Sequence, residues 1–137
     1  MLRFQVIGCG AAGNKATIHL VESEVLNKDE FSYLLINSTS KDIPANYREK
    51  ALIFGKSLGG CGKERDIAKD MIIHDEDNGI RALDKMVDPY ADVVIVCGST
   101  EGGTGSASVP MISKYISSVL KQPVIACLFF GFNDDAR

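Results

Sequence analysis

The sequence predicts an α/β fold, a three-layer sandwich around a mostly parallel, Rossmann-like sheet. Short apolar runs rich in β-branched residues lie at 4–8, 31–37, 92–98 and 123–131, with a weaker fifth at 51–55. They are nearly continuous rather than alternating, which is typical of strands that are covered on both faces. Segments with helical periodicity lie between them, and strands that alternate with helices form βαβ units.

The helices are predicted from apolar residues that recur at spacings of three and four. The first group follows the first strand, the second precedes the fourth strand, and the third precedes the fifth strand. Their members are Ile18, Val21 and Val25; Ile67 and Met71, with Ile80, Leu83 and Val87 after the interruption "DEDNG"; and Val109, Ile112, Ile116, Val119 and Leu120. Pro110 is placed in the first turn of the last helix, where proline is tolerated.

Composition places the chain among ordinary globular proteins. Its 137 residues are 45% hydrophobic and 24% charged, enough for one domain with a real core, and we assign residues 1–137 to one domain. A net charge of −3 argues against a general nucleic-acid or anionic-membrane surface. No apolar run approaches the roughly 18–20 residues of a membrane span. The four cysteines are scattered without a CxxC pair, so we expect a cytoplasmic protein without disulfides or structural zinc.

Three of the predicted strands are followed by glycine-rich connections: "GCGAAGNK" at 8–15, "GKSLGGCGKERD" at 55–66 and "EGGTGSAS" at 101–108. In an α/β sheet, ligands bind where these connections gather, at the carboxyl ends of the strands. Glycine lets backbone N–H groups approach an anion, and the following helix adds its positive N-terminal end. The three connections together predict a polyphosphate ligand.

Each connection alone has a plainer explanation. "GCGAAG" matches GxGxxG, a pattern that is frequent by chance, and "GGCG" alone is typical of a turn. A Rossmann-type NAD or FAD domain would use Gly8, Gly10 and Gly13 for the pyrophosphate, and an acid at the end of the second strand for the ribose. Asn37 occupies that place, and this interpretation gives the third connection no function. The chain has no GxxxxGK[ST] and therefore no P-loop.

Taken in order, these motifs resemble the tubulin/FtsZ superfamily. "GGTGS" is similar to the family signature GGGTG[ST]G, "VIGCGAAGNKA" to the first nucleotide loop of FtsZ, "LINSTSKD" to the second and "GGCGKERDIAKD" to the third. "FFGFNDDAR" stands where FtsZ has its ribose loop. The resemblance covers all 137 residues. "GCGKER" and "INSTSKD" look closer to the phage and plasmid TubZ-like branch than to division FtsZ.

The resemblance implies a GTPase that binds GTP or GDP with Mg²⁺ carried by the nucleotide. It implies self-association into head-to-tail filaments, in which GTP is hydrolysed between subunits. The next subunit supplies acidic residues from a later loop, so no catalytic residue is assigned in this chain. The TubZ-like wording implies phage or plasmid DNA positioning or segregation, with a DNA-binding adaptor as a further partner and no direct nucleic-acid or membrane binding.

The resemblance also assigns nucleotide-binding residues by position. The phosphates would be held from one side by residues of the signature and from the other by the first loop. The third loop would approach the γ-phosphate, the second would border the phosphate and its Mg²⁺, and the last segment would bind the ribose. In the same order, the residues are Gly102, Gly103, Thr104, Gly105 and Ser106; Gly10, Ala11, Ala12, Gly13, Asn14 and Lys15; Gly60, Cys61 and Gly62; Asn37, Ser38 and Thr39; and Asp135.

Departures from the family pattern sharpen these expectations. Glu101 replaces the first glycine of the signature and brings a negative charge to the phosphates, so we expect it to point outward. Lys15 stands where FtsZ has an asparagine that contacts the base, which leaves guanine selectivity open. These two residues motivate an alternative, a non-catalytic tubulin-like module that binds a partner.

The chain ends in the polar segment "FGFNDDAR", directly after the fifth predicted strand. We therefore expect the N-terminal GTP-binding domain of a longer protein. The family's central helix, catalytic acidic loop and C-terminal domain are absent from residues 1–137. GTPase activity is accordingly expected of the full-length polymer, and this piece alone is expected to be inactive.

Overall fold

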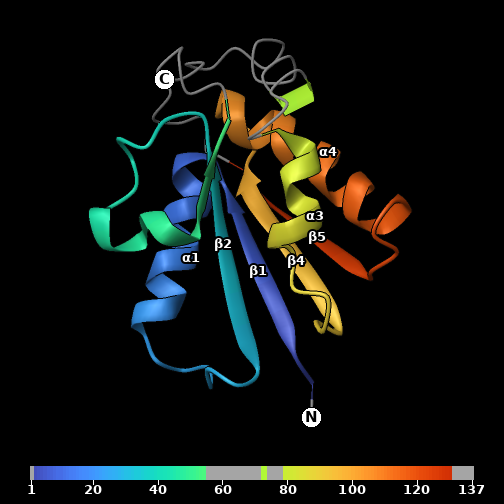
Figure 1. Ribbon diagram of the computed structural model, residues 1–137. Coiled ribbons are helices and arrows are strands. Elements are labelled where there is room, and N and C mark those ends of the chain that lie inside the picture. Colours follow the sequence, from blue (N-terminus) through green and yellow to red (C-terminus); the bar gives the residue numbers. More distant parts are fainter. Residues whose placement is uncertain (1, 55–71, 74–78, 131–137) are drawn as a thin grey trace.

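The computed structural model describes residues 2–54, 72–73 and 79–130 (Figure 1). Within them, five strands form one sheet in the order β3-β2-β1-β4-β5, and every neighbouring pair is parallel. The predicted parallel sheet is thus confirmed. The strands are β1 (Phe4–Cys9), β2 (Phe31–Asn37), β3 (Ala51–Ile53), β4 (Val93–Ser99) and β5 (Val124–Phe129).

The order of the strands reverses next to β1. The chain runs from β1 outward to β2 and β3, then returns to the other side of β1 for β4 and β5. The carboxyl ends of β1, β2 and β4 are level, because Cys9 is in register with Ile36 on one side and with Gly98 on the other. Such a switch point is where doubly wound sheets bind ligands.

Helices cover both faces of the sheet, which confirms the predicted three layers. Figure 1 shows α1 (Gly10–Glu22) and the short 3₁₀ helix η1 (Ala45–Lys50) on one side of the strands. On the other side lie α3 (Leu83–Met86), preceded by the 3₁₀ helix η3 (Ile80–Ala82), and α4 (Gly103–Ser118).

The core is divided between the two faces of the sheet, and β2 shows how. Leu34 and Ile36 belong to the larger hydrophobic cluster, together with residues of α3 and α4 such as Leu83 and Ile112. Leu35, between them in sequence, packs instead with the cluster on the α1 side. A strand that is buried on both faces has no polar face, which explains the continuous apolar runs in the sequence.

Several helix boundaries differ from the sequence prediction. Helix α4 ends at Ser118, so Val119 and Leu120 lie beyond it, and α3 ends at Met86, before Val87. Helix α1 ends at Glu22, and Glu24 adopts a left-handed φ of 55°. Val25 therefore lies outside the helix and is 76% exposed. Helix α4 begins at Gly103, well before Pro110, so this proline is in the helix interior rather than the first turn, and its side chain faces solvent. Ile67 and Met71 lie outside the described residues.

None of the helices within residues 2–54, 72–73 and 79–130 is both long and apolar enough to cross a membrane.

Candidate functional site

Three of the predicted nucleotide loops follow β1, β2 and β4, the three central strands, and meet at their carboxyl ends. The first and third of them touch: a Cβ on Gly10 would lie 3.0 Å from the backbone nitrogen of Gly105. The second is tied to the third by a 3.0 Å hydrogen bond between the hydroxyls of Ser38 and Thr104. The structure therefore brings together segments that lie far apart in the sequence.

Two helices start at this meeting point. Helix α1 begins at Gly10, immediately after β1, and α4 begins at Gly103, with three residues between it and the end of β4. Neither has a side-chain hydrogen bond at its N-cap, and neither has an acidic residue in its first turn. The N-terminus of a helix carries a partial positive charge and N–H groups that no carbonyl of the helix accepts. This arrangement favours an anionic ligand.

The glycines of the site have different structural reasons. A Cβ on Gly13 would lie 2.6 Å from the carbonyl oxygen of Cys97, so this glycine lets α1 pack closely onto β4. A Cβ on Gly105 would lie 3.0 Å from the carbonyl oxygen of Ser99, which places α4 equally close to its own strand. Gly102, in contrast, has no atom of the described residues within 4 Å of its Cβ position. Among the residues that the structure describes, open space next to the start of α4 is therefore found at Gly102.

The predicted site residues differ in how accessible they are. Asn14, Asn37, Ser38 and Thr104 are buried, with at most 7% of their surface exposed. The exposed residues are Ala11 and Lys15 on α1 and Glu101 before α4; Ala12, Thr39, Gly102 and Ser106 are partly exposed, and Gly10, Gly13, Gly103 and Gly105 are buried. Glu101 is exposed, as expected, and its backbone N–H donates to Ser99 Oγ at 3.1 Å.

Asn14 and Asn37 are hydrogen-bonded to each other. Asn37 Nδ2 donates to Asn14 Oδ1 at 2.7 Å, and Asn14 Nδ2 donates to the carbonyl oxygens of Gly8 and Ile36. The side-chain amide of Asn14 therefore joins α1 to both β1 and β2.

Four predicted contacts, Gly60, Cys61, Gly62 and Asp135, lie outside the described residues.

Two residues support the site without having been assigned to it from the sequence; Gly8 was considered only for the dinucleotide alternative. Ser108 Oγ donates a hydrogen bond to the carbonyl oxygen of Thr104, one helical turn earlier. Gly8 packs so closely beneath α1 that an added Cβ would lie 2.3 Å from Thr17 Oγ1. The sequence signals were a hydroxyl four residues after Thr104 and the first glycine of GxGxxG.

The buried cysteines belong to the core rather than to a reactive centre. Burial raises the pKa of the Cys9 thiol to about 12, against the opposing hydrogen bond with Ser108. Burial likewise raises the pKa of Cys97, whose Sγ lies 3.8 Å from Thr17 Oγ1. A nucleophilic cysteine needs a lowered pKa, so neither is a candidate nucleophile. Within the described part of the chain, no three His, Cys, Asp or Glu side chains gather to hold a metal ion.

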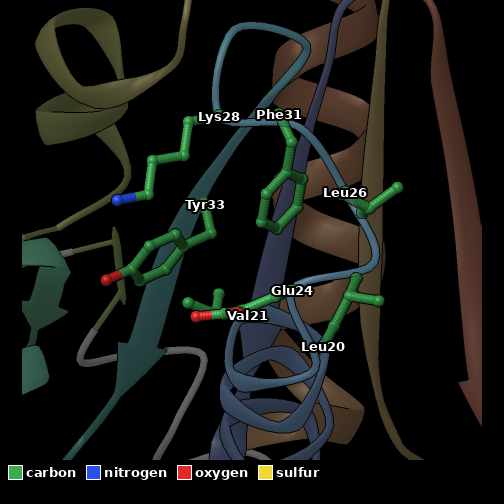
Figure 2. Close-up of a pocket in the computed structure, with 7 residues that line it drawn as sticks. All are labelled: Leu20, Val21, Glu24, Leu26, Lys28, Phe31 and Tyr33. Atoms are coloured by element: carbon green, nitrogen blue, oxygen red, sulfur yellow. The ribbon is translucent and has the colours of Figure 1, made fainter.

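A pocket of about 460 Å³ lies at the opposite end of the sheet, between the last turn of α1 and the start of β2. Figure 2 shows the rings of Phe31 and Tyr33 in its wall, opposite Leu20 and Val21. Lys28 brings the pocket's one lining cation. With mostly apolar walls, no glycine and no helix N-terminus, it does not fit a polyphosphate.

A second pocket of about 340 Å³, also at the amino ends of the strands, is lined by charged residues that include Arg3, Lys85 and Asp88. Arg3 and Asp88 form an ion pair with Nε and Oδ2 2.7 Å apart. Glu49, Lys50 and Lys85 also line this pocket, so it carries charges of both signs. The carboxyl edge of the sheet remains the candidate binding site.

Comparisons with known proteins match this geometry. The family profile described as "Tubulin/FtsZ family, GTPase domain" matches residues 3–137. A cell division protein FtsZ from Methanothermobacter thermautotrophicus is 29% identical over 115 residues, 82% of this chain and 28% of that protein. The tubulin-like protein CetZ5 from Haloferax volcanii is 23% identical over 125 residues, 85% of this chain and 32% of that protein. The chain thus spans about a third of the length of these relatives.

Solved structures of similar fold include the GDP-bound monomer of CetZ1 from Haloferax volcanii. It is 23% identical, with a TM-score of 0.81, over 98% of this chain and 43% of that chain. A GTPγS-form protofilament of TubZ from Bacillus thuringiensis serovar israelensis is 19% identical, with a TM-score of 0.71, over 93% of this chain and 36% of that chain. These likenesses confirm the Rossmann-like α/β fold.

Proposed function

The chain belongs to the tubulin/FtsZ family, GTPase domain, and from this premise we propose that it binds GTP and GDP at the carboxyl edge of its sheet. The observation that carries the proposal is the convergence of two helix N-termini, at Gly10 and Gly103, whose N-cap residues Cys9 and Gly102 make no capping side-chain hydrogen bond. Each offers backbone N–H groups and a partial positive charge to a phosphate.

The phosphates would lie between the first turns of the two helices. In this proposal the residues that face them are Gly102 to Ser106 from the signature segment after β4 and Gly10 to Gly13 from the first loop. The open space at Gly102 fits such a ligand. Lys15 is exposed on α1 and is proposed to lie toward the base. Gly60, Cys61, Gly62 and Asp135 stay proposed contacts of the γ-phosphate and the ribose.

Mg²⁺ would arrive with the nucleotide in this proposal, with Ser38 and Thr39 bordering it. Mg²⁺ usually binds through few protein ligands and the substrate phosphates, and it neutralises charge on the β- and γ-oxygens. The chain's own part is to hold the phosphates through backbone amides.

A dinucleotide such as NAD is the weaker candidate. Its ribose would need an acidic side chain at the end of β2. Asn37 occupies that position and is 2% exposed. Its Nδ2 donates to Asn14, and its Oδ1 accepts from the backbone N–H of Ser38. The alternative, a non-catalytic partner-binding module, differs from the proposed function in its affinity for GTP, so a measurement of GTP binding distinguishes the two.

We extend the proposal to the longer protein of which this domain would be part. Its subunits would assemble head to tail and hydrolyse GTP between them, with acidic residues supplied by the neighbouring subunit. Solved neighbours of the same fold are described as protofilaments, among them a GTPγS-bound protofilament of CetZ2 from Haloferax volcanii. Phage or plasmid DNA positioning through a DNA-binding adaptor is the process that we propose for this filament, and a cytoplasmic location goes with it.

The proposal is tested by identifying the nucleotide that the purified protein carries. Acid release followed by chromatography and mass spectrometry should yield GDP or GTP, and fluorescent GTP should be displaced by GTP and GDP but not by ATP or NAD. Release of NAD or a flavin would overturn the proposal in favour of a dinucleotide domain. Absence of Mg²⁺-dependent GTP binding would favour the partner-binding module.

A further inference from the structure

Four buried polar side chains form a continuous chain of hydrogen bonds beneath the candidate site. Asn14 lies on α1, Asn37 ends β2, Ser38 follows it, and Thr104 lies in the first turn of α4. Their exposed fractions are 0%, 2%, 2% and 7%. The links are Asn37 Nδ2 to Asn14 Oδ1 at 2.7 Å and Ser38 Oγ to Thr104 Oγ1 at 3.0 Å. This series of hydrogen bonds therefore connects all three of the loops that meet at the site.

Asn14 uses both ends of its side-chain amide inside the protein. Its Nδ2 donates to Gly8 O at 2.8 Å and to Ile36 O at 3.2 Å, and its Oδ1 accepts from Asn37. An asparagine amide has two N–H donors, and both have partners here. Since Asn14 is also fully buried, no part of its side chain is presented to a ligand.

Asn37 connects the side chain of Asn14 to the backbone of the loop after β2. Its Oδ1 accepts from the N–H of Ser38 at 2.7 Å and from the N–H of Thr39 at 3.4 Å. These bonds fix the direction in which the chain leaves β2, and with it the position of the Ser38 hydroxyl. Through Thr104, that hydroxyl reaches the first turn of α4.

We propose that Asn14 and Asn37 are positioning residues that fix the spacing of the three loops and do not themselves touch the nucleotide. This inference rests on the proposed function, and it replaces the direct contacts expected of these two side chains by an indirect role. Buried polar networks of this kind are rigid when every member is satisfied, and a deletion within one is felt by all its members. The affinity for the nucleotide phosphates then depends on the hydrogen-bonded side chains of Asn14 and Asn37, which do not contact the ligand.

A double-mutant cycle tests the proposal on nucleotide affinity. Asn14→Ala and Asn37→Ala should each weaken GTP binding, by roughly fivefold if the effect is that of one lost hydrogen bond. If the two residues act through their mutual bond, the double variant should bind no more weakly than the weaker single variant. A loss in the double variant equal to the product of the two single losses would show two independent contacts and overturn the proposal.

Gln5 offers a matched control, because its side chain is also a buried amide. It lies near the amino end of β1, away from the carboxyl edge of the sheet where the candidate site lies. It is 3% exposed, donates to Met86 O at 3.3 Å and accepts from the N–H of Asp88 at 2.9 Å. Gln5→Ala should lower the melting temperature without changing GTP affinity. An equal loss of affinity in Gln5→Ala would show that the effect of Asn14→Ala is general destabilisation, and would overturn the proposal.

Amide hydrogen exchange without nucleotide keeps this test separate from that of the proposed function. Asn14→Ala should speed exchange at residues 38–39 and 103–106, whereas Gln5→Ala should leave both segments unchanged. If the wild-type protein binds no GTP, the proposed function fails while this measurement still tests the coupling. Unchanged exchange at residues 103–106 in Asn14→Ala would overturn it.

Ser38→Ala serves if Asn14→Ala does not fold, because it leaves the Asn14–Asn37 pair intact and removes the hydroxyl that bonds Thr104. Exchange should then rise at residues 103–106. No rise there would overturn the coupling.

Discussion

Gly10 and Gly105 approach each other so closely that a Cβ on Gly10 would lie 3.0 Å from the backbone nitrogen of Gly105. One begins α1 and the other lies in the first turn of α4. The backbones of Gly10 and Gly105 therefore set the distance between the two helix N-termini, and with it the space left for a phosphate. An added side chain would alter the site even if it never touched a ligand.

Gly10→Ala is expected to damage both the fold and the site. Gly10 has a φ of +74°, which is strained for any residue with a Cβ. The strain and the contact with Gly105 should lower the free energy of unfolding by about 1–3 kcal/mol, measured by urea titration, and GTP affinity should fall. Gly102→Ala is the control, because Gly102 has a φ of −84° and no atom of the described residues within 4 Å of its Cβ position. Equal stability of the two variants would contradict the prediction.

Thr104→Ala should weaken nucleotide binding while the protein stays folded. The substitution removes the hydroxyl that bonds Ser38 and so links the loop after β4 to the loop after β2. A lost hydrogen bond is worth about 1 kcal/mol, or roughly fivefold in affinity, which titration with fluorescent GTP would detect. Thr104→Ser keeps the hydroxyl and should bind nearly as well as the wild type. If Thr104→Ala binds as tightly as Thr104→Ser, the hydroxyl has no part in the site.

Glu101→Gln should hold or strengthen GTP binding. Glu101 is exposed at the end of β4, two residues before α4 begins, and its negative charge opposes that of the phosphates. Exposed charges are strongly screened, so the gain should be about two- to threefold at low salt and should vanish near 1 M salt. Isothermal titration at several salt concentrations measures it. A marked loss of binding would show that Glu101 has a role of its own.

The sequence predicted the strands well because their environment is simple. Strands buried on both faces must be apolar throughout, and the predicted run 31–37 coincides with β2. The strand-helix alternation also predicted which connections gather at one edge, since the carboxyl ends of parallel strands share an edge. The loops around Gly10 and Thr104 were located in this way without the structure, whereas the loop around Ser38 was located by its resemblance to a family motif.

The interior of the site could not be predicted in the same way. The sequence does not show whether Asn14, in a glycine-rich stretch, faces the ligand or the strands, because this depends on contacts with Gly8, Ile36 and Asn37 across the fold. The start of α4 was misplaced because Gly103 and Gly105 have low helix propensity. Packing against Ser99 and Cys9 overrides that propensity.

Native alkylation should separate the cysteines of the described core by burial. Cys97 and Cys127 are in register on β4 and β5, yet Cys97 is 5% exposed and Cys127 is exposed. Burial also raises the pKa of Cys9 to about 12, which disfavours the reactive thiolate. N-ethylmaleimide at pH 7.5 should label Cys127 well before Cys9 or Cys97, as peptide mapping would show. Equal labelling of Cys97 and Cys127 would mean that β5 separates readily from β4.

Asp88→Asn should make stability less dependent on pH. Asp88 accepts hydrogen bonds from Arg3 Nε at 2.7 Å, Ser32 Oγ at 3.1 Å and the N–H of Tyr90 at 2.9 Å. Burial alone would raise the pKa of Asp88, but these bonds, together with the charge of Arg3, lower it below its ordinary value of 3.8. A carboxyl whose pKa is lowered by folding stabilises the folded state above pH 3.8, and this contribution is lost as the pH falls through the folded pKa.

The wild type should therefore exceed Asp88→Asn in unfolding free energy by about 1–3 kcal/mol at pH 7, the cost of losing a charged hydrogen-bond acceptor. The difference should shrink steadily as the pH falls below 3.8, in urea titrations at each pH. Asp29→Asn is the control: Asp29 is exposed, and Arg3 bonds its backbone carbonyl rather than its carboxylate. A gap between wild type and Asp88→Asn that stays constant down to pH 2 would show that Arg3, Ser32 and Tyr90 do not depend on the charge of Asp88.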